Sequence, residues 1–139
     1  MVGVVVVTHS ALADELVLAT QQIVGTVEGI EPISIDPSEP TEEIKKRIKR
    51  ALKKVDTGEG VLVLTDMFGG TPSNISLSFL EKGKVEVVTG VNLPMLLKLA
   101  TLKDEMSLEE LASFIREYGQ RNIHLASEIL ERRGEKGGR

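Results

Sequence analysis

The sequence predicts an α/β domain, built as an open, mostly parallel sheet with helices on both faces. Short apolar runs recur along the chain, a segment with helical spacing follows each, and glycine or polar residues stand where each run ends. The chain has 139 residues, of which 41% are hydrophobic and 3% aromatic. That length suits one domain with an aliphatic core.

The first predicted strand covers residues 2–7, an all-apolar, valine-rich run typical of a strand buried on both faces. Residues 11–24 show helical spacing, with Leu12, Leu16, Ala19 and Ile23 on one face, and Gly25 suits the end of the helix. Residues 30–35 predict the second strand, in which apolar residues alternate.

The second helix is predicted from the prolines at 37 and 40 to about residue 55, because its apolar residues form a stripe at helical spacing. The opposite face is basic and would ordinarily be solvated, although it could dock an acidic partner. The stripe consists of Ile44, Ile48, Ala51, Leu52 and Val55, and the basic face of Lys45, Lys46, Arg47, Lys49, Arg50, Lys53 and Lys54.

The third and fourth strands are predicted at 61–65 and 85–89. Between them, Thr71 suits the N-cap and Pro72 the first position of a helix that runs to about residue 80. A fourth helix follows Pro94, and Ser107 with Glu110 forms a capping box for a fifth helix that ends near residue 119.

The segment after residue 119 is compatible with a strand or with a helix. Ile123 and Leu125 alternate with Asn122 and His124, which favours a short strand at 121–127. Residues 134–139 are expected to be a frayed tail. We divide the chain into a domain at 1–127 and a C-terminal tail at 128–139.

Composition excludes several classes of function. The chain has no cysteine, so disulfides and thiolate metal sites are excluded. A net charge of -4 and the scarcity of aromatic residues argue against a nucleic-acid partner. Nothing resembles a signal peptide or approaches the roughly 20 apolar residues of a membrane span. We therefore expect a soluble cytoplasmic protein.

The candidate chemistry lies where the strands end, which is where ligands bind in this fold class. His9 follows the first strand and Asp66 follows the third. With a strand order of 2-1-3-4, these two strands are neighbours, and the two side chains would face each other. A neutral imidazole is a good nucleophile toward phosphorus, and a carboxylate on its other nitrogen fixes the tautomer.

An anionic phosphoryl group would need donors beside His9. The helix that opens at Thr71 offers free N–H groups, and Gly69 and Gly70 let the backbone approach closely. The helix that opens near Ser10 could add a second set of donors. Asn92, in the loop after the fourth strand, is a further binding candidate. We expect neither metal nor cofactor in this arrangement.

The residues around these positions resemble the mannose-type IIA component of the bacterial phosphoenolpyruvate:sugar phosphotransferase system. Three segments carry the resemblance: the first strand with Thr8 and His9, the stretch from Val61 to Asn74, and the stretch from Gly90 to Leu96. Their order and spacing agree over about residues 1–127. Ser10 stands where a glycine often follows the histidine, and Phe68 stands where many members have tryptophan.

The resemblance implies that His9 accepts a phosphoryl group from the phosphocarrier HPr and passes it to a IIB component during sugar uptake. Asp66 would hold the imidazole through Nδ1–H, leaving Nε2 to attack, and Thr71 would help to cradle the phosphoryl group. It also implies the strand order 2-1-3-4 and a homodimer that exchanges an antiparallel fifth strand near the C-terminus. The membrane would be reached only through IIC and IID subunits.

Three alternatives stay open. The chain could be the phosphocarrier subunit of a dihydroxyacetone kinase, although we expect that subfamily to lack the run from Phe68 to Pro72. It could be a regulatory IIA protein without a transporter. It could also be a nucleotide- or flavin-binding α/β module without covalent chemistry, against which the lack of a glycine-rich phosphate loop after the first strand argues.

Overall fold

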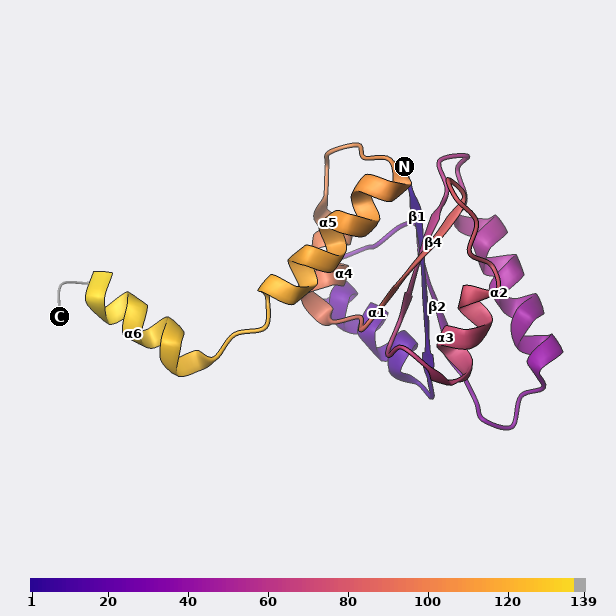
Figure 1. The fold of residues 1–139 in the computed structure, drawn as a ribbon, viewed down its shortest axis with the longest axis horizontal. Helices are drawn as coiled ribbons and strands as arrows, with labels where there is room; N and C mark the ends of the chain where they lie inside the picture. Colours follow the sequence, from indigo (N-terminus) through magenta and orange to yellow (C-terminus); the bar gives the residue numbers. More distant parts are fainter. Residues whose placement is uncertain (137–139) are drawn as a thin grey trace.

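Four parallel strands form the centre of the chain in a computed structural model that describes residues 1–136 (Figure 1). The strands are β1 (Gly3–His9), β2 (Ile30–Ile35), β3 (Val61–Thr65) and β4 (Val85–Thr89). Their order is β2-β1-β3-β4, so the predicted strand order is confirmed. β1 is central and buried along its length except at His9, as expected of a valine-rich strand covered on both faces.

Helices cover both faces of the sheet (Figure 1). One face carries α1 (Leu12–Val24), α4 (Leu93–Thr101) and α5 (Leu108–Arg121), and the other carries α2 (Thr41–Val55) and α3 (Gly70–Leu77). The side chains of each strand divide by alternation between two aliphatic cores. Val4, Val6, Leu62 and Leu64 belong to the first core, and Val5, Val7, Val61 and Val63 to the second.

The buried face of α1 differs from the predicted one. Ala13, Val17 and Thr20 are buried, whereas Leu12 is 44% and Ile23 60% exposed. Leu16 of the predicted stripe is half-buried against the core, but the centre of the buried face lies about one residue further along the helix, facing β2 and α4. A prediction from the large apolar side chains alone therefore rotates the buried face of this helix by about one residue.

The C-terminal region also departs from the prediction. α5 ends at Arg121, residues 122–125 form no regular structure, and α6 (Ala126–Lys136) follows, so the strand predicted at 121–127 is wrong for the isolated chain. A strand needs a neighbouring strand to bond its backbone, whereas a helix bonds its own. Residues 134–136 continue α6 rather than fraying, and 137–139 lie outside the described residues. Figure 1 shows α6 projecting away from the sheet.

No helix within residues 1–136 combines the length and the apolar character that crossing a bilayer requires.

Candidate functional site

His9 and Asp66 meet at the carboxyl edge of the sheet. β1 and β3 are parallel neighbours in which Val7 pairs with Thr65, so the residues that follow emerge side by side. The His9 Nδ1 atom lies 2.8 Å from Oδ2 of Asp66, and the backbone N–H of His9 donates to the same oxygen at 3.0 Å. The carboxylate therefore holds both the backbone and the ring of His9.

This contact decides which ring nitrogen is available for chemistry. An ionised carboxylate can only accept hydrogen bonds, so Nδ1 carries the proton and Nε2 of a neutral ring keeps its lone pair. The side chain of His9 is 50% exposed and that of Asp66 only 13%. Nε2 is thus the nucleophilic nitrogen, on a ring that a partner can reach.

His9 favours the ionised form of Asp66. Burial raises the pKa of Asp66, but hydrogen bonds from the backbone and imidazole of His9 outweigh burial, and the pKa lies below its ordinary value of 3.8. Its other oxygen, Oδ1, is buried without a hydrogen-bond partner among the described residues. Both hydrogen bonds that the Asp66 side chain accepts from other residues therefore come from His9.

Gly70 closes the site on the other side of the ring. A Cβ atom at this position would lie 3.0 Å from both Cε1 and Nε2 of His9, and the φ of Gly70 is +84°. Both the space and the backbone conformation therefore require glycine. Gly69 also has a positive φ, +92°, but a Cβ there would meet nothing within 4 Å.

The N-terminus of α3 is open beside Nε2. The helix begins at Gly70 with Gly69 as its N-cap, two residues earlier than predicted, and no side chain within residues 1–136 caps its N–H groups. Thr71 therefore lies in the first turn rather than at the cap, with its side chain exposed. Uncapped N–H groups and the positive end of the helix dipole favour an anion at this position.

The N-terminus of α1 is closed by contrast. The N–H of Ala13 donates to Oγ1 of Thr8 at 2.7 Å, and the N–H of Asp14 donates to Oγ of Ser34 at 3.2 Å. These two donors are therefore not free for a phosphoryl group, which removes most of the second donor set expected near Ser10. Ser10 itself turns the chain in a left-handed conformation, with φ +53°.

Asn92 lies in the loop after β4, but the fold already uses its side chain. Its Oδ1 accepts from the N–H of Met95 at 3.1 Å, which caps α4, and its Nδ2 donates to the carbonyl of Gly119 in α5 at 3.1 Å. These bonds use Oδ1 and one of the two Nδ2 hydrogens, so Asn92 could still donate its second hydrogen to an anion. Asn92 thus links α4 to α5, and its role in binding stays a prediction.

Two features of the site were not anticipated from the sequence. The hydroxyls that cap α1 belong to Thr8 in β1 and Ser34 in β2. In the sequence, only the position of Thr8 directly before His9 indicates such a role for Thr8, and nothing indicates one for Ser34. Leu12, Met67 and Phe68 expose 44%, 52% and 74% of their surface in the segments that follow His9 and Asp66. Exposed apolar side chains next to a reactive residue are typical of a surface that binds another protein.

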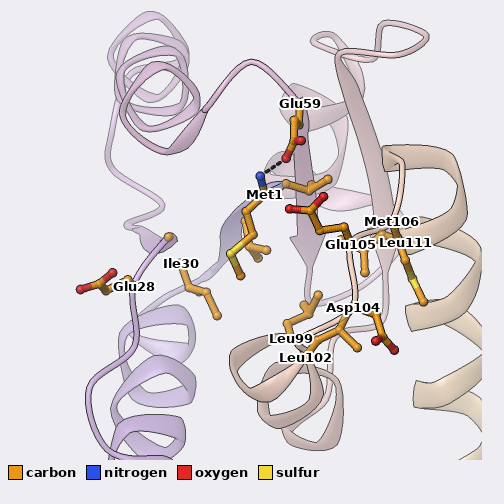
Figure 2. A pocket seen from close by; sticks show the side chains of 13 residues that line it. Met1, Glu28, Ile30, Glu59, Leu99, Leu102, Asp104, Glu105, Met106 and Leu111 are labelled. Atoms are coloured by element: carbon orange, nitrogen blue, oxygen red, sulfur yellow. Dashed lines mark ion pairs between the residues drawn. The ribbon is translucent and has the colours of Figure 1, made fainter.

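A separate cavity of about 40 Å³ lies at the amino-terminal edge of the sheet, and His9 is not among its lining residues (Figure 2). Met1, Ile30, Leu99 and Met106 line it, and the Met1 ammonium group pairs with Glu59. It has room for a few water molecules at most. Residues 1–136 contain no group of three or more side chains suited to hold a metal ion.

Comparison with known proteins gives consistent matches. Residues 3–116 match the family model described as PTS system fructose IIA component. The chain is 33% identical over 124 residues to the mannose-specific EIIAB component of Escherichia coli K12, covering 88% of this chain but only 38% of that longer protein. It is 34% identical over 113 residues to the sorbose-specific EIIA component of Lacticaseibacillus casei, covering 81% of each. The crystal structure of EIIA from Streptococcus agalactiae has the same fold, with a TM-score of 0.82, 23% identity and coverage of 92% and 99%.

Proposed function

Because the chain belongs to the mannose, fructose and sorbose family of phosphotransferase-system IIA components, we propose that His9 carries a phosphoryl group from HPr to a IIB component during sugar uptake. The observation that carries the proposal is the placement of the His9 ring. Asp66 occupies Nδ1 at 2.8 Å, and Nε2 faces Gly70 at the open end of α3.

This geometry supports the following transfer. Nε2 of His9 attacks phosphorus, and the bond between phosphorus and the donor histidine breaks as the new P–N bond forms. The Nδ1 proton remains in its bond with Asp66, whose negative charge stabilises the positive charge that the ring gains. The N–H groups of Gly70 and Thr71 and the Thr71 hydroxyl stabilise the transferring oxygens. The same steps in reverse deliver the group to IIB.

The partners would dock over the His9 edge of the sheet. Leu12, Met67 and Phe68 supply exposed apolar surface there, which an approaching carrier would cover. In this role the chain acts in the cytoplasm and meets the membrane only through IIC and IID subunits.

We also propose that the protein is a homodimer in which the segment at 121–127 becomes a strand on a second copy. β4 is an edge strand, and a groove of about 600 Å³ lies between it and α5. Ile123 and Leu125 are 77% and 63% exposed, so the isolated chain leaves them uncovered. Sedimentation velocity should find a dimer for the whole chain and a monomer for a chain ending at Arg121; a monomeric whole chain would refute the exchange.

Labelling with radioactive phosphoenolpyruvate, enzyme I and HPr tests the phosphocarrier role. We expect one acid-labile, base-stable phosphate per chain, none in the His9→Gln variant, and normal labelling in His124→Gln, which changes the second of the two histidines. Retention of the label in His9→Gln would overturn the proposal.

A further inference from the structure

Five exposed basic side chains form a continuous stripe along α2. Lys46, Lys49, Arg50, Lys53 and Lys54 follow the spacing i, i+3, i+4, i+7 and i+8, which places them on one side of a helix. We call them the α2 basic stripe. The opposite side of α2 is buried in the core, so the stripe faces solvent along about 12 Å of helix.

Most of this charge is not neutralised within the protein. Lys46 pairs with Glu43 at 3.6 Å and Lys54 with Glu31 at 3.1 Å, and both pairs are exposed. Lys49, Arg50 and Lys53 have no ion pair within residues 1–136. Exposed pairs contribute little to stability, so the fold itself does not account for the stripe.

The charge is also segregated from the rest of the chain. α2 carries seven Lys and Arg residues against two Glu residues, a net +5, in a chain whose net charge is -4. The residues outside α2 therefore carry a net charge of -9. A positive stripe on an otherwise acidic protein gives the surface a strong local preference for an anionic partner.

A groove of about 230 Å³ runs beside the stripe, between α2 and β2, the edge strand on this side of the sheet. Arg47, Arg50 and Lys54 line it together with the apolar atoms of Pro32, Ile33 and Ala51, and Glu31 completes the lining. Arg47 is already engaged by Glu39 at 2.7 Å and by the Ser34 carbonyl at 3.1 Å. Arg50 is the guanidinium in the groove that has no ion pair among the described residues.

The free edge of β2 is poorly suited to pair with a further strand. Pro32 has no N–H to offer, and Arg47 already bonds the carbonyl of Ser34. An occupant of the groove would therefore bind through its side chains, with carboxylates on the basic residues and an apolar side chain against the half-buried Pro32.

The geometry points to the α2 basic stripe and its groove as a docking surface for an acidic segment of a protein partner, separate from the His9 edge. A bilayer contacts protruding side chains rather than a groove, α2 has no free apolar face to insert, and the remaining net charge of -9 would be repelled by anionic lipid. Nucleic acid is disfavoured because aromatic residues for stacking make up 3% of the chain. The inference does not depend on the chemistry of His9.

The test measures binding of a fluorescein-labelled peptide to the full-length protein by fluorescence anisotropy. The peptide has about twelve residues, all glutamate except for two central leucines. Lys49→Ala/Arg50→Ala/Lys53→Ala should weaken binding by about tenfold, because it removes the three basic side chains without partners. The matched variant Lys82→Ala/Lys103→Ala/Arg133→Ala lowers the net charge equally at exposed positions elsewhere and should leave binding within about twofold. Circular dichroism and labelling of His9 should be unchanged in both variants.

Four results would overturn the inference. These are the absence of peptide binding to the wild-type protein, equal weakening in the two triple variants, tighter stripe-dependent binding of phosphatidylglycerol vesicles than of the peptide, and tighter stripe-dependent binding of a single-stranded oligonucleotide. None of them bears on phosphorylation of His9, so this inference and the proposed function can fail independently.

Discussion

Two helix N-termini flank His9, and they differ in one respect that matters for chemistry. α1 begins three residues after His9, and its N–H groups at Ala13 and Asp14 are taken by the hydroxyls of Thr8 and Ser34. α3 begins at Gly70, against the imidazole, and none of the described side chains caps it. The chain therefore closes one anion-binding terminus and leaves the other open.

The difference separates anchoring from binding. The capping hydroxyls tie α1 to β1 and β2, which fixes the end of the strand that carries His9. The open terminus of α3 faces Nε2, where the phosphoryl group would be held. The predictions below test this division, starting with the largest expected effect.

Replacing Gly70 with alanine should cause the largest loss of phosphoryl transfer, because it alters the open end of α3 beside His9. The new Cβ would lie 3.0 Å from Cε1 and Nε2, so the ring must move, and we expect phosphoryl transfer to slow by about a hundredfold. Gly69→Ala is the matched control, because Gly69 also has a positive φ, +92°, but a Cβ there would meet no described atom within 4 Å. Initial transfer rates and thermal unfolding should be measured for both.

If the two alanine variants slow transfer equally, backbone strain rather than contact with the ring accounts for the loss. The role given to Gly70 would then be wrong.

Replacing Asp66 with asparagine should slow transfer by about thirtyfold, the rate equivalent of losing about 2 kcal/mol of charge-assisted hydrogen bonding. The fold should be retained, since the amide oxygen of the new side chain can still accept from the backbone N–H of His9. Rapid-quench transfer from phosphorylated HPr measures the effect. A full rate in this variant would remove the orienting role of the carboxylate.

The Asp66→Asn variant also has a defined pH dependence. The folded-state pKa of Asp66 is lowered, so its ionisation contributes stability that is present above the unfolded pKa of about 3.9 and is lost as pH falls through the folded value. In urea unfolding, the stability gap between wild type and variant should therefore shrink on going from about pH 6 toward strongly acidic conditions.

Valine substitutions at Thr8 and Thr71 should separate the two helix ends. Thr8→Val removes the acceptor for the Ala13 N–H and should lower the free energy of unfolding by about 1–2 kcal/mol, with normal transfer by the folded protein. Thr71→Val should slow transfer by about fivefold with little change in stability, since it removes an exposed hydroxyl. Urea unfolding and transfer rates on the same samples distinguish the two outcomes, and a reversed pattern would contradict the division between the helix ends.

The sequence predicts the sheet well, because the buried strands are short aliphatic runs and the order 2-1-3-4 follows from the family resemblance. It also predicts which residues gather around His9, since Asp66 and the glycine pair follow a neighbouring strand. It does not predict which donors remain free. The acceptor from Ser34 comes from another strand, and a hydroxyl gives no sign in the sequence of which amide it will bond.

Two further differences have local physical causes. The buried face of α1 is set by how closely α1 approaches its neighbours, which selects Ala13 over Leu12. The segment at 121–127 alternates like a strand, but a single chain offers it no strand partner, so Leu125 instead begins the turn into α6. The periodicity of one sequence does not state how closely two helices approach or whether a strand has a neighbour to pair with.

The most direct measurement is the position of phosphate on the imidazole. Phosphorus NMR of the protein phosphorylated through HPr distinguishes a phosphoryl group on Nε2 from one on Nδ1. Because Asp66 occupies Nδ1 and the open end of α3 faces Nε2, we predict a single resonance from Nε2-linked phosphate on His9. Phosphate on Nδ1, or on any residue other than His9, would contradict the account.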